Sequence, residues 1–181
     1  MKKINSILFK KSLSKFTTGI TIITINKDGL ILGKTVNSFA ALSLKPPLVL
    51  FSLDKKSSSI EKYLNSKNIG INFLSNKQRN ISKYFSLKNS SWNNTKYILT
   101  KKNSVPMIKD CVANLHCKKN KVIKEGDHFL FICKILEIQI DNIIALGQMS
   151  PNMQLHAKIA SNEYITDKEN HFNSYDTYIE K

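Results

Sequence analysis

A run of β-branched residues that leads into an Asp-Gly pair is the feature that most constrains this chain. Residues Thr17–Asn26 read TTGITIITIN, Lys27, Asp28 and Gly29 follow, and a second apolar segment occupies Leu30–Ser38. β-branched side chains favour strands, and Asp-Gly favours the tight turn of a hairpin. The sequence therefore predicts a β-hairpin at this point.

The other apolar runs indicate a chain built mostly from strands. Leu48–Leu53 is nearly unbroken, which is typical of a strand buried on both faces of a closed barrel. Apolar patterning also predicts strands at Ile69–Leu74, Cys111–Cys117, Phe129–Ile140, Ile143–Leu146 and Met153–Ile159, and helices at Asn5–Phe16, from Ile60 onward and at Asn76–Phe85. No repeat and no βαβα alternation is present, so we predict a mainly β fold with short helices, arranged as a small β-barrel.

The chain has the length of one domain. Of its 181 residues we assign 1–165 to that domain and 166–181 to a polar C-terminal tail, which we expect to be frayed or to depend on a partner. Ser86–Thr100 is polar apart from Trp92 and Tyr97. Two interpretations stay open for it: a loop that covers a site, or a surface loop whose Trp92 lies at the edge of the core.

The formal charge of +15 raises the question of nucleic-acid binding, because basic faces gain affinity for phosphate by releasing counterions. The distribution does not favour it, since Arg79 is the only arginine and no basic block contains stacking aromatics. We expect the positive field to attract small anions such as nucleotides instead. No apolar run approaches the ~18–20 residues of a membrane span, so we expect a cytoplasmic protein without membrane contact.

Cysteine and histidine spacings give no sign of a metal site. Cys111, Cys117 and Cys133 form no CxxC, and they lack the Cys/His spacing typical of zinc. We therefore expect reduced, buried thiols and no bound metal. A GxSxG elbow, a Walker A loop and a GxGxxG fingerprint are also absent from the sequence. No sequence motif therefore indicates a hydrolase, and neither of the two commonest phosphate-binding loops is present.

Hydroxyl and amide side chains around Gly33–Ser59 are the remaining candidates for binding. Ser57, Ser58 and Ser59 precede a predicted helix, where hydroxyls and helix amides suit an anion; a simple serine N-cap is the open alternative. Thr35, Asn37 and Ser38 either face a ligand or form an edge strand satisfied by water. The residues alone leave both pairs of alternatives open.

Five segments in one order resemble a known family. GKTVNSFAALSLKPPLVLFSLDKKSSS is similar to the diagnostic core of flavin reductase-like proteins of the FMN-binding split-barrel class, the reductase components of two-component monooxygenases. The segments FKKSLSKFTTGITIITI, NIGINFLSNKQRNISKYFS, VPMIKDCVANLHCKK and EGDHFLFICKILEI extend the resemblance over roughly Leu8–Ile140. Where relatives close with an aromatic, a basic residue and glycine, this chain has Met153–Lys158, in which His156 and Lys158 are the candidate substitutes.

The resemblance implies a set of flavin-binding residues. The polar edge and ribityl chain of FMN would meet Thr35, Val36, Asn37 and Ser38, with backbone approach at the small-residue turn of Ala40, Ala41 and Ser43. The ribityl and phosphate end would meet Ser52, Asp54, Ser57, Ser58 and Ser59, assisted by Lys55 or Lys56. Further contacts would come from Asn72, Leu74, Ser75, Arg79 and Phe85. His128 of Gly126-Asp127-His128 would lie near the nicotinamide; a structural or surface histidine is the alternative.

The implied function is that of an NAD(P)H-dependent flavin reductase. It would pass a hydride from NADH or NADPH to FMN, with FAD as the alternative flavin, and would supply a partner monooxygenase. The resemblance also implies a homodimer. Two alternatives remain: a flavin-binding split-barrel protein without nicotinamide-driven turnover, and, less favoured, a basic nucleic-acid-binding barrel.

Overall fold

The computed structural model describes residues 4–87, 92, 95–141 and 147–148. Thr18–Gln148 forms one compact unit, and the N-terminal segment Met1–Thr17 belongs to a second. In that second unit, helix α1 spans Ser6–Leu13, and the Asn5 side chain caps it by accepting hydrogen bonds from the backbone N–H groups of Ile7 and Leu8. The helix predicted at Asn5–Phe16 is confirmed, over the shorter range Ser6–Leu13. The apolar side chains of α1 are largely exposed.

The predicted hairpin is confirmed by strands β2 (Thr21–Lys27) and β3 (Leu30–Val36), which pair antiparallel. The two turn residues, Asp28 and Gly29, have φ of 54° and 84°. Positive φ at both positions is what a two-residue hairpin turn of the type I′ kind requires, and Asp and Gly are among the residues that tolerate it.

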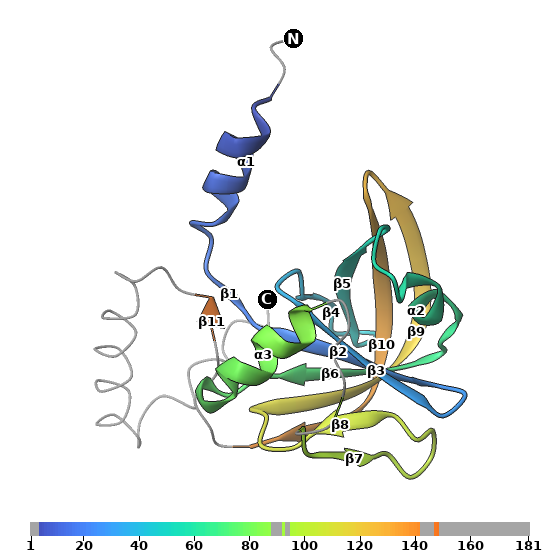
Figure 1. Ribbon diagram of the computed structural model, residues 1–181. Coiled ribbons are helices and arrows are strands. Elements are labelled where there is room, and N and C mark those ends of the chain that lie inside the picture. Colours follow the sequence, from blue (N-terminus) through green and yellow to red (C-terminus); the bar gives the residue numbers. More distant parts are fainter. Residues whose placement is uncertain (1–3, 88–91, 93–94, 142–146, 149–181) are drawn as a thin grey trace, which may run out of the picture. The chain divides into compact units, whose positions relative to one another are not determined.

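Seven antiparallel strands form the main sheet in the order β3-β2-β6-β9-β10-β5-β4 (Figure 1). The strands not yet bounded are β4 (Ala40–Ser43), β5 (Leu48–Asp54), β6 (Asn68–Phe73), β9 (Ala113–Glu125) and β10 (His128–Ile140). Two small sheets accompany it: β1 (Thr18–Gly19) pairs with β11 (Gly147–Gln148), and β7 (Tyr97–Leu99) pairs with β8 (Pro106–Ile108). The mainly antiparallel β fold with short helices is thus confirmed.

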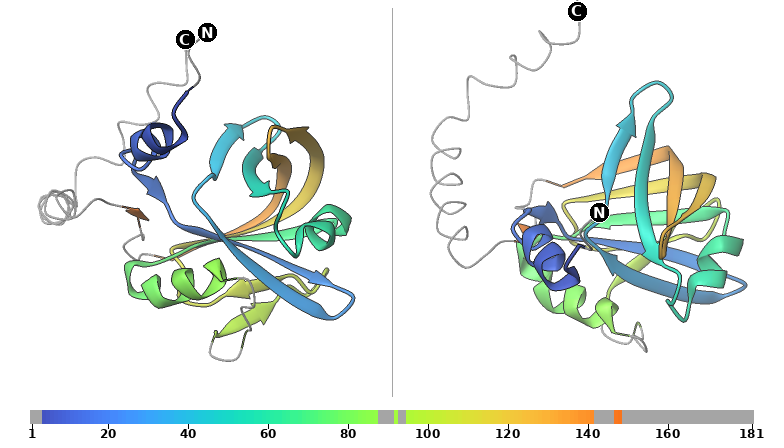
Figure 2. Two further views of the ribbon diagram at one scale, coloured as in Figure 1. Left: turned by 45° about the horizontal axis from the view of Figure 1, so that its top comes forward. Right: turned by 90° about the horizontal axis from the view of Figure 1, so that it is seen from above.

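The β4–β5 hairpin projects from one end of this sheet (Figure 2). The structure corrects the expectation of a small-residue turn at Ala40–Ser43, because these residues form the edge strand β4. It also corrects the expectation that β5 is buried on both faces. Val49, Phe51 and Leu53 are buried while alternate residues are only half-buried, so one face of β5 packs on the core.

Three short helices complete the unit. They are α2 (Ile60–Asn65), the 3₁₀ turn η1 (Asn76–Gln78) and α3 (Arg79–Ser86). The helices predicted after Ser59 and at Asn76–Phe85 are therefore confirmed, the second with a tighter first turn. Phe85 is fully buried against β3, where a Cβ on Gly33 would come within 2.7 Å of its ring. Glycine at this position lets α3 approach the sheet closely.

The core lies under β2, β5, β6, β9 and β10. Phe51 and Phe131 stack with ring centroids 5.0 Å apart, and the buried Tyr63 hydroxyl donates to the Ile23 carbonyl. Burial accordingly raises the pKa of Tyr63 far above its ordinary value. All three cysteines are buried and unpaired, as expected; burial raises the pKa of Cys111 and of Cys133 to about 12.

The expected loop at Ser86–Thr100 is only partly a loop. Ser86 ends α3 and Tyr97–Leu99 forms β7, whose partner β8 was not predicted. Trp92 packs against the rings of Phe85 and Tyr97, and its indole N–H donates to the Ile31 carbonyl at 3.1 Å. The interpretation of Trp92 as a core-edge residue is confirmed.

Some predictions fall outside the described residues. They are the strands at Ile143–Leu146 and Met153–Ile159, the substitutes His156 and Lys158, and the tail 166–181. Among the helices of the described chain, none combines the length and apolarity needed to cross a membrane.

Candidate functional site

A polar recess lies where β3 ends, β5 ends and β10 begins. Its volume is about 200 Å³. The residues that line it are Lys34, Thr35, Val36, Asn37, Ser38, Ser52, Leu53, Asp54 and His128. Six of the predicted flavin-binding residues and the predicted nicotinamide-side histidine thus meet at one place, although the first and last residues of the lining, Lys34 and His128, are 94 positions apart in the sequence.

Strand register explains why His128 reaches this recess. β10 pairs with β5 so that His128 lies opposite Asp54 and Leu130 lies opposite Ser52. Directly opposite residues of an antiparallel pair have Cβ atoms ~4.5–5.5 Å apart and point to the same face. The end of β5 and the start of β10 therefore present their polar side chains together.

Two hydroxyls fix the ends of the strands around the recess. Ser38 Oγ accepts from the Ser52 backbone N–H at 2.9 Å and donates to the Ser52 carbonyl at 3.1 Å, which ties the segment after β3 to β5. Thr35 Oγ1 donates to the Ser82 carbonyl of α3 at 2.7 Å. A hydroxyl that donates inward keeps acceptor lone pairs for a ligand N–H. Thr35 and Ser38 are thus anchored without losing all binding capacity.

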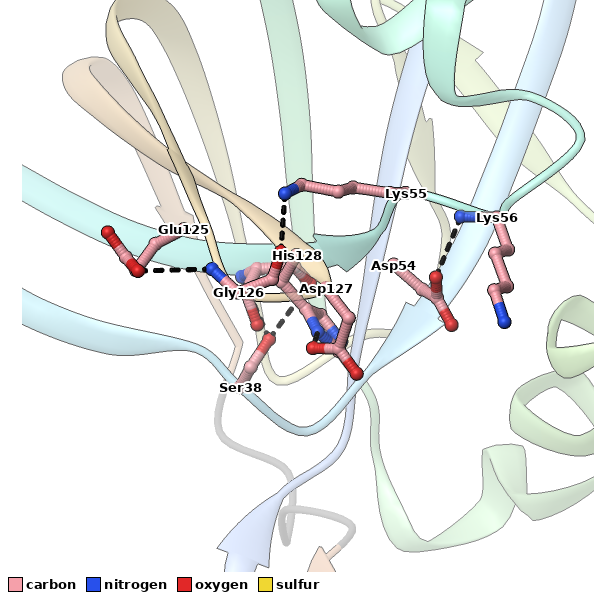
Figure 3. Close-up of polar contacts among 9 residues, drawn as sticks. Ser38, Asp54, Lys55, Lys56, Glu125, Gly126, Asp127 and His128 are labelled. Atoms are coloured by element: carbon pink, nitrogen blue, oxygen red, sulfur yellow. Dashed lines mark hydrogen bonds and ion pairs between the residues drawn. The ribbon is translucent and has the colours of Figure 1, made fainter.

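The turn between β9 and β10 holds His128 at the rim (Figure 3). His128 Nδ1 lies 2.6 Å from Asp127 Oδ1, and this hydrogen bond keeps the pKa of the Asp127 carboxyl below its ordinary value. The Lys55 backbone N–H donates to the Asp127 carbonyl at 3.0 Å, and the Lys55 amine donates to the Gly126 carbonyl. The Lys55 amine thus secures this turn, and the expectation that Lys55 or Lys56 assists at a phosphate stays a prediction.

The serine cluster lies outside the recess. Ser59 occupies the cap position of α2 with φ −103° and ψ 5° and makes no side-chain cap, so the simple N-cap interpretation is wrong. Ser57 Oγ and Ser59 Oγ are 3.3 Å apart. With six residues, α2 is too short to supply a helix-terminus anion site, so any phosphate contact by Ser57, Ser58 and Ser59 rests on their hydroxyls and stays a prediction.

Asn72 is not placed to contact a flavin. Its side chain is fully buried and donates to the Ile22 carbonyl at 2.9 Å and to Thr24 Oγ1 at 3.1 Å. Its Oδ1 accepts from the Ile108 N–H and from Asn114 Nδ2, each at 2.8 Å. All its donors and both acceptor positions are used, so the predicted flavin contact is corrected to a structural role.

Leu74, Ser75 and Phe85 are likewise interior residues. Leu74 and Phe85 belong to a buried apolar cluster, and Ser75 is 1% exposed in a reciprocal capping box with Gln78. Their side chains offer no surface to a ligand, so a flavin contact by these three residues would have to come from the backbone and stays a prediction. Ala41, Ser43 and Arg79 lie outside the residues that line the recess, and their flavin roles stay predictions.

The sequence-based set missed Lys34, Leu53 and Asp127. Lys34 and Leu53 line the recess, and Asp127 hydrogen bonds with His128. Each of the three is next in sequence to a residue of the predicted set. Extending that set by one residue on each side would have included them. Within the part of the chain that the structure describes, no group of three His, Cys, Asp or Glu side chains could hold a metal ion.

Comparisons with known proteins agree with this geometry. A family model described as "Flavin reductase like domain" matches residues 13–150. FMN reductase (NADH) SmoA of Agrobacterium fabrum is 33% identical over 132 residues, covering 73% of this chain and 75% of that protein. The flavin-dependent monooxygenase reductase subunit HsaB of Mycobacterium tuberculosis is 36% identical over 128 residues, covering 67% and 65%.

The crystal structure of flavin reductase HpaC complexed with NADP+ shares the fold. It aligns with a TM-score of 0.72 and 30% identity, over 79% of this chain and 92% of that chain. The fold therefore belongs to the antiparallel β class that flavin reductases of known structure adopt. The family match and the sequence identities narrow this class further: the chain belongs to the flavin reductase-like family.

Proposed function

We propose that the chain is an NAD(P)H-dependent flavin reductase that passes a hydride from a nicotinamide nucleotide to FMN. The observation that carries the proposal is the convergence of the Thr35–Ser38 segment, Ser52, Asp54 and His128 on one recess. The names of the relatives support it, since SmoA is an FMN reductase that uses NADH and HpaC was crystallised with NADP+.

The recess fits part of a flavin. Its volume of about 200 Å³ is below the ~300 Å³ at which ordinary small-molecule pockets begin, so it would receive one end of the ligand while the rest lies across the open surface. Thr35 and Ser38 offer acceptor lone pairs to ring N–H groups, and Lys34 adds positive charge beside them. The donor and acceptor set thus suits the polar edge of a ligand such as a flavin.

When bound, FMN would supply the hydride acceptor, and the protein would supply orientation and electrostatics. The anchored ends of β3 and β5 would orient the polar edge of the ligand. His128, whose side chain is 44% exposed, would contact and position the nicotinamide from the opposite rim. Its hydrogen bond to Asp127 would hold the ring in one orientation.

Further parts of the proposal concern the cellular setting. We place the protein in the cytoplasm as a homodimer that supplies reduced flavin to a partner monooxygenase, with FMN rather than FAD as flavin and either NADH or NADPH as reductant. The name of HsaB, a monooxygenase reductase subunit, supports the partner.

Support for the dimer comes from the sequence resemblance. The split-barrel closure is supported by the Ser38–Ser52 bridge, which joins the β3 end of the sheet to β5 near the opposite edge.

An absorbance titration tests the proposed activity. The purified protein is titrated with FMN and then, without oxygen, with NADH and separately NADPH. We expect saturable FMN binding and rapid loss of the yellow colour on adding one of the reductants. Binding without bleaching would identify a flavin-binding protein without turnover. Absence of both would refute the proposal, and steep salt-dependent oligonucleotide binding in that case would favour the nucleic-acid alternative.

A further inference from the structure

A second cavity, of about 580 Å³, is lined by residues of the β7–β8 hairpin, of β9 and of the C-terminal part of β10. Its lining includes the apolar side chains of Ile98, Leu99 and Ile138, which are 45%, 46% and 57% exposed. Its volume is in the range of ordinary small-molecule sites. Apolar walls of this kind gain free energy when a hydrocarbon body covers them.

This cavity is separate from the polar recess. Glu137 lines the cavity and His128 lines the recess. Both residues belong to strand β10, where nine positions of sequence separate them. At ~3.3 Å per residue a straight strand would separate them by about 30 Å, and the two irregularities of β10 between them shorten this distance somewhat. A ligand in the cavity would therefore not touch the proposed flavin site of the same chain.

His116 gives the cavity a buried polar end, and its Nδ1 makes no hydrogen bond to the described residues. The side chain is 2% exposed, and Asn103 Nδ2 lies 3.4 Å from its Nε2. Among the described residues Nδ1 has no hydrogen-bond partner, since Glu137 Oε2 is 3.7 Å away. A buried polar atom without a hydrogen-bond partner is unfavourable, so a ligand group that pairs with Nδ1 would gain free energy there.

Charge around this end favours an anion. Lys101 and Lys102 line the cavity beside His116, and both are exposed. The one carboxylate in the lining, Glu137, is 66% exposed and can turn into water. A ligand carboxylate could then accept from Nδ1 while the two ammonium groups neutralise it.

From this geometry we infer that the cavity binds a small organic carboxylate with an apolar body. The carboxylate lies between His116, Lys101 and Lys102, and the hydrocarbon covers Ile98 and Ile138. The site is independent of the proposed flavin chemistry, so it stands or fails separately from the reductase activity.

Fluorescence titration of the full-length protein with 1-anilinonaphthalene-8-sulfonate, an aromatic anion, tests the site. We expect one saturable site from which benzoate displaces the dye, while the neutral isostere benzyl alcohol and FMN do not. Replacing both lysines (Lys101→Gln with Lys102→Gln) should weaken binding about tenfold, corresponding to ~1.4 kcal/mol. The matched double variant Lys121→Gln with Lys124→Gln, on an exposed part of β9 outside the cavity, should bind normally.

Two single variants sharpen the test. Glu137→Gln removes the competing carboxylate and should tighten benzoate binding, the opposite sign to the lysine change. Ile98→Asp should abolish it, while Leu136→Asp, a similarly exposed residue outside the lining, should not. Added benzoate should also shift the His116 imidazole nitrogen resonances. No saturable binding, equal affinity in the lysine and control variants, or displacement of the dye by FMN would each overturn the inference.

Discussion

Two polar clusters on the same sheet behave in opposite ways. In the recess, Thr35 and Ser38 hydrogen bond to backbone groups and still face an opening lined by Asp54 and His128. Around Asn72, the side chains of Thr24 and Asn114 are buried with it, and every Asn72 donor and acceptor is paired. Polar residues that resemble a family's binding motif can therefore belong to a ligand site or to the interior, and burial decides which.

The interior cluster attaches the β7–β8 hairpin to the sheet. Thr24 Oγ1 donates to the Pro106 carbonyl at 2.6 Å, and Asn114 Nδ2 donates to the Ile108 carbonyl at 3.1 Å. Since a buried unpaired group costs much more than a paired one contributes, such a network is sensitive to the loss of any member. The open recess, whose groups can turn to water, should tolerate substitution with little effect on stability.

The largest expected effect follows from Asn72→Leu. This change leaves the Ile108 N–H without its acceptor and removes a partner from Thr24 and Asn114, so the free energy of unfolding should fall by about 3 kcal/mol. Urea denaturation measures it. The recess control Ser52→Ala should change stability by less than about 0.5 kcal/mol, because the Ser52 backbone makes the bridge to Ser38. Equal losses in the two variants would remove the distinction between the clusters.

Gly70→Ala should give the next largest effect. A Cβ at this position would come within 2.2 Å of Thr24 Oγ1 and 2.9 Å of the Pro106 carbonyl oxygen. Because the carbonyl is backbone and cannot move aside easily, we expect a loss of about 2 kcal/mol in unfolding free energy. Gly19→Ala, which meets nothing within 4 Å, is the matched control. A neutral Gly70→Ala would mean that the interior cluster is loosely packed.

His128→Ala should change activity without changing stability. The side chain is 44% exposed, so the unfolding free energy should stay within about 0.5 kcal/mol of wild type. Loss of its contact with the nicotinamide should lower kcat/KM for NADH about tenfold, or ~1.4 kcal/mol, with FMN affinity unchanged. The exposed β9 variant Lys121→Ala is the control in steady-state assays. If kcat/KM for NADH is unaltered in His128→Ala, His128 does not contact the nicotinamide and is a surface residue.

The smallest effect concerns the buried thiols. Burial raises the pKa of Cys111 and Cys133 to about 12 and that of Cys117 still further, so ionisation is disfavoured in the folded state. Their contribution to stability is complete below the unfolded thiol pKa of about 9 and is lost as the pH rises above it. Between pH 7 and 8.5 the unfolding free energy should fall by about 0.5 kcal/mol. Urea midpoints across this range, compared with those of Cys133→Ala, measure it; rapid thiol labelling of the native protein would contradict the burial.

Much of the fold was predictable from local pattern. The Asp28-Gly29 turn, the capped first helix and the long β10 strand all follow from residue types and periodicity. β8 was missed because Pro106–Ile108 is a three-residue strand whose pairing with β7 depends on tertiary contacts. One-sided burial of β5 was missed because an apolar run does not show which of its residues face the core.

The candidate site was predictable where its residues are adjacent in sequence. Thr35–Ser38, Ser52 and Asp54 come from one stretch, and the resemblance supplied His128. The sequence did not reveal that the side chains of Asn72, Leu74 and Phe85 are buried, because alternation along β6 and the packing of α3 decide this. The position of the Lys55 side chain could not be predicted from the sequence either, because its amine hydrogen bonds to Gly126, which lies 71 residues later in the chain.

A crystal structure of the protein with FMN tests the central claim most directly. The account predicts flavin density across the recess, with the Thr35–Ser38 segment and Ser52 in contact, His128 at the nicotinamide-facing side, and Asn72 still buried in its network. Flavin bound elsewhere, for example in the cavity beside His116, with the recess filled only by water, would contradict it.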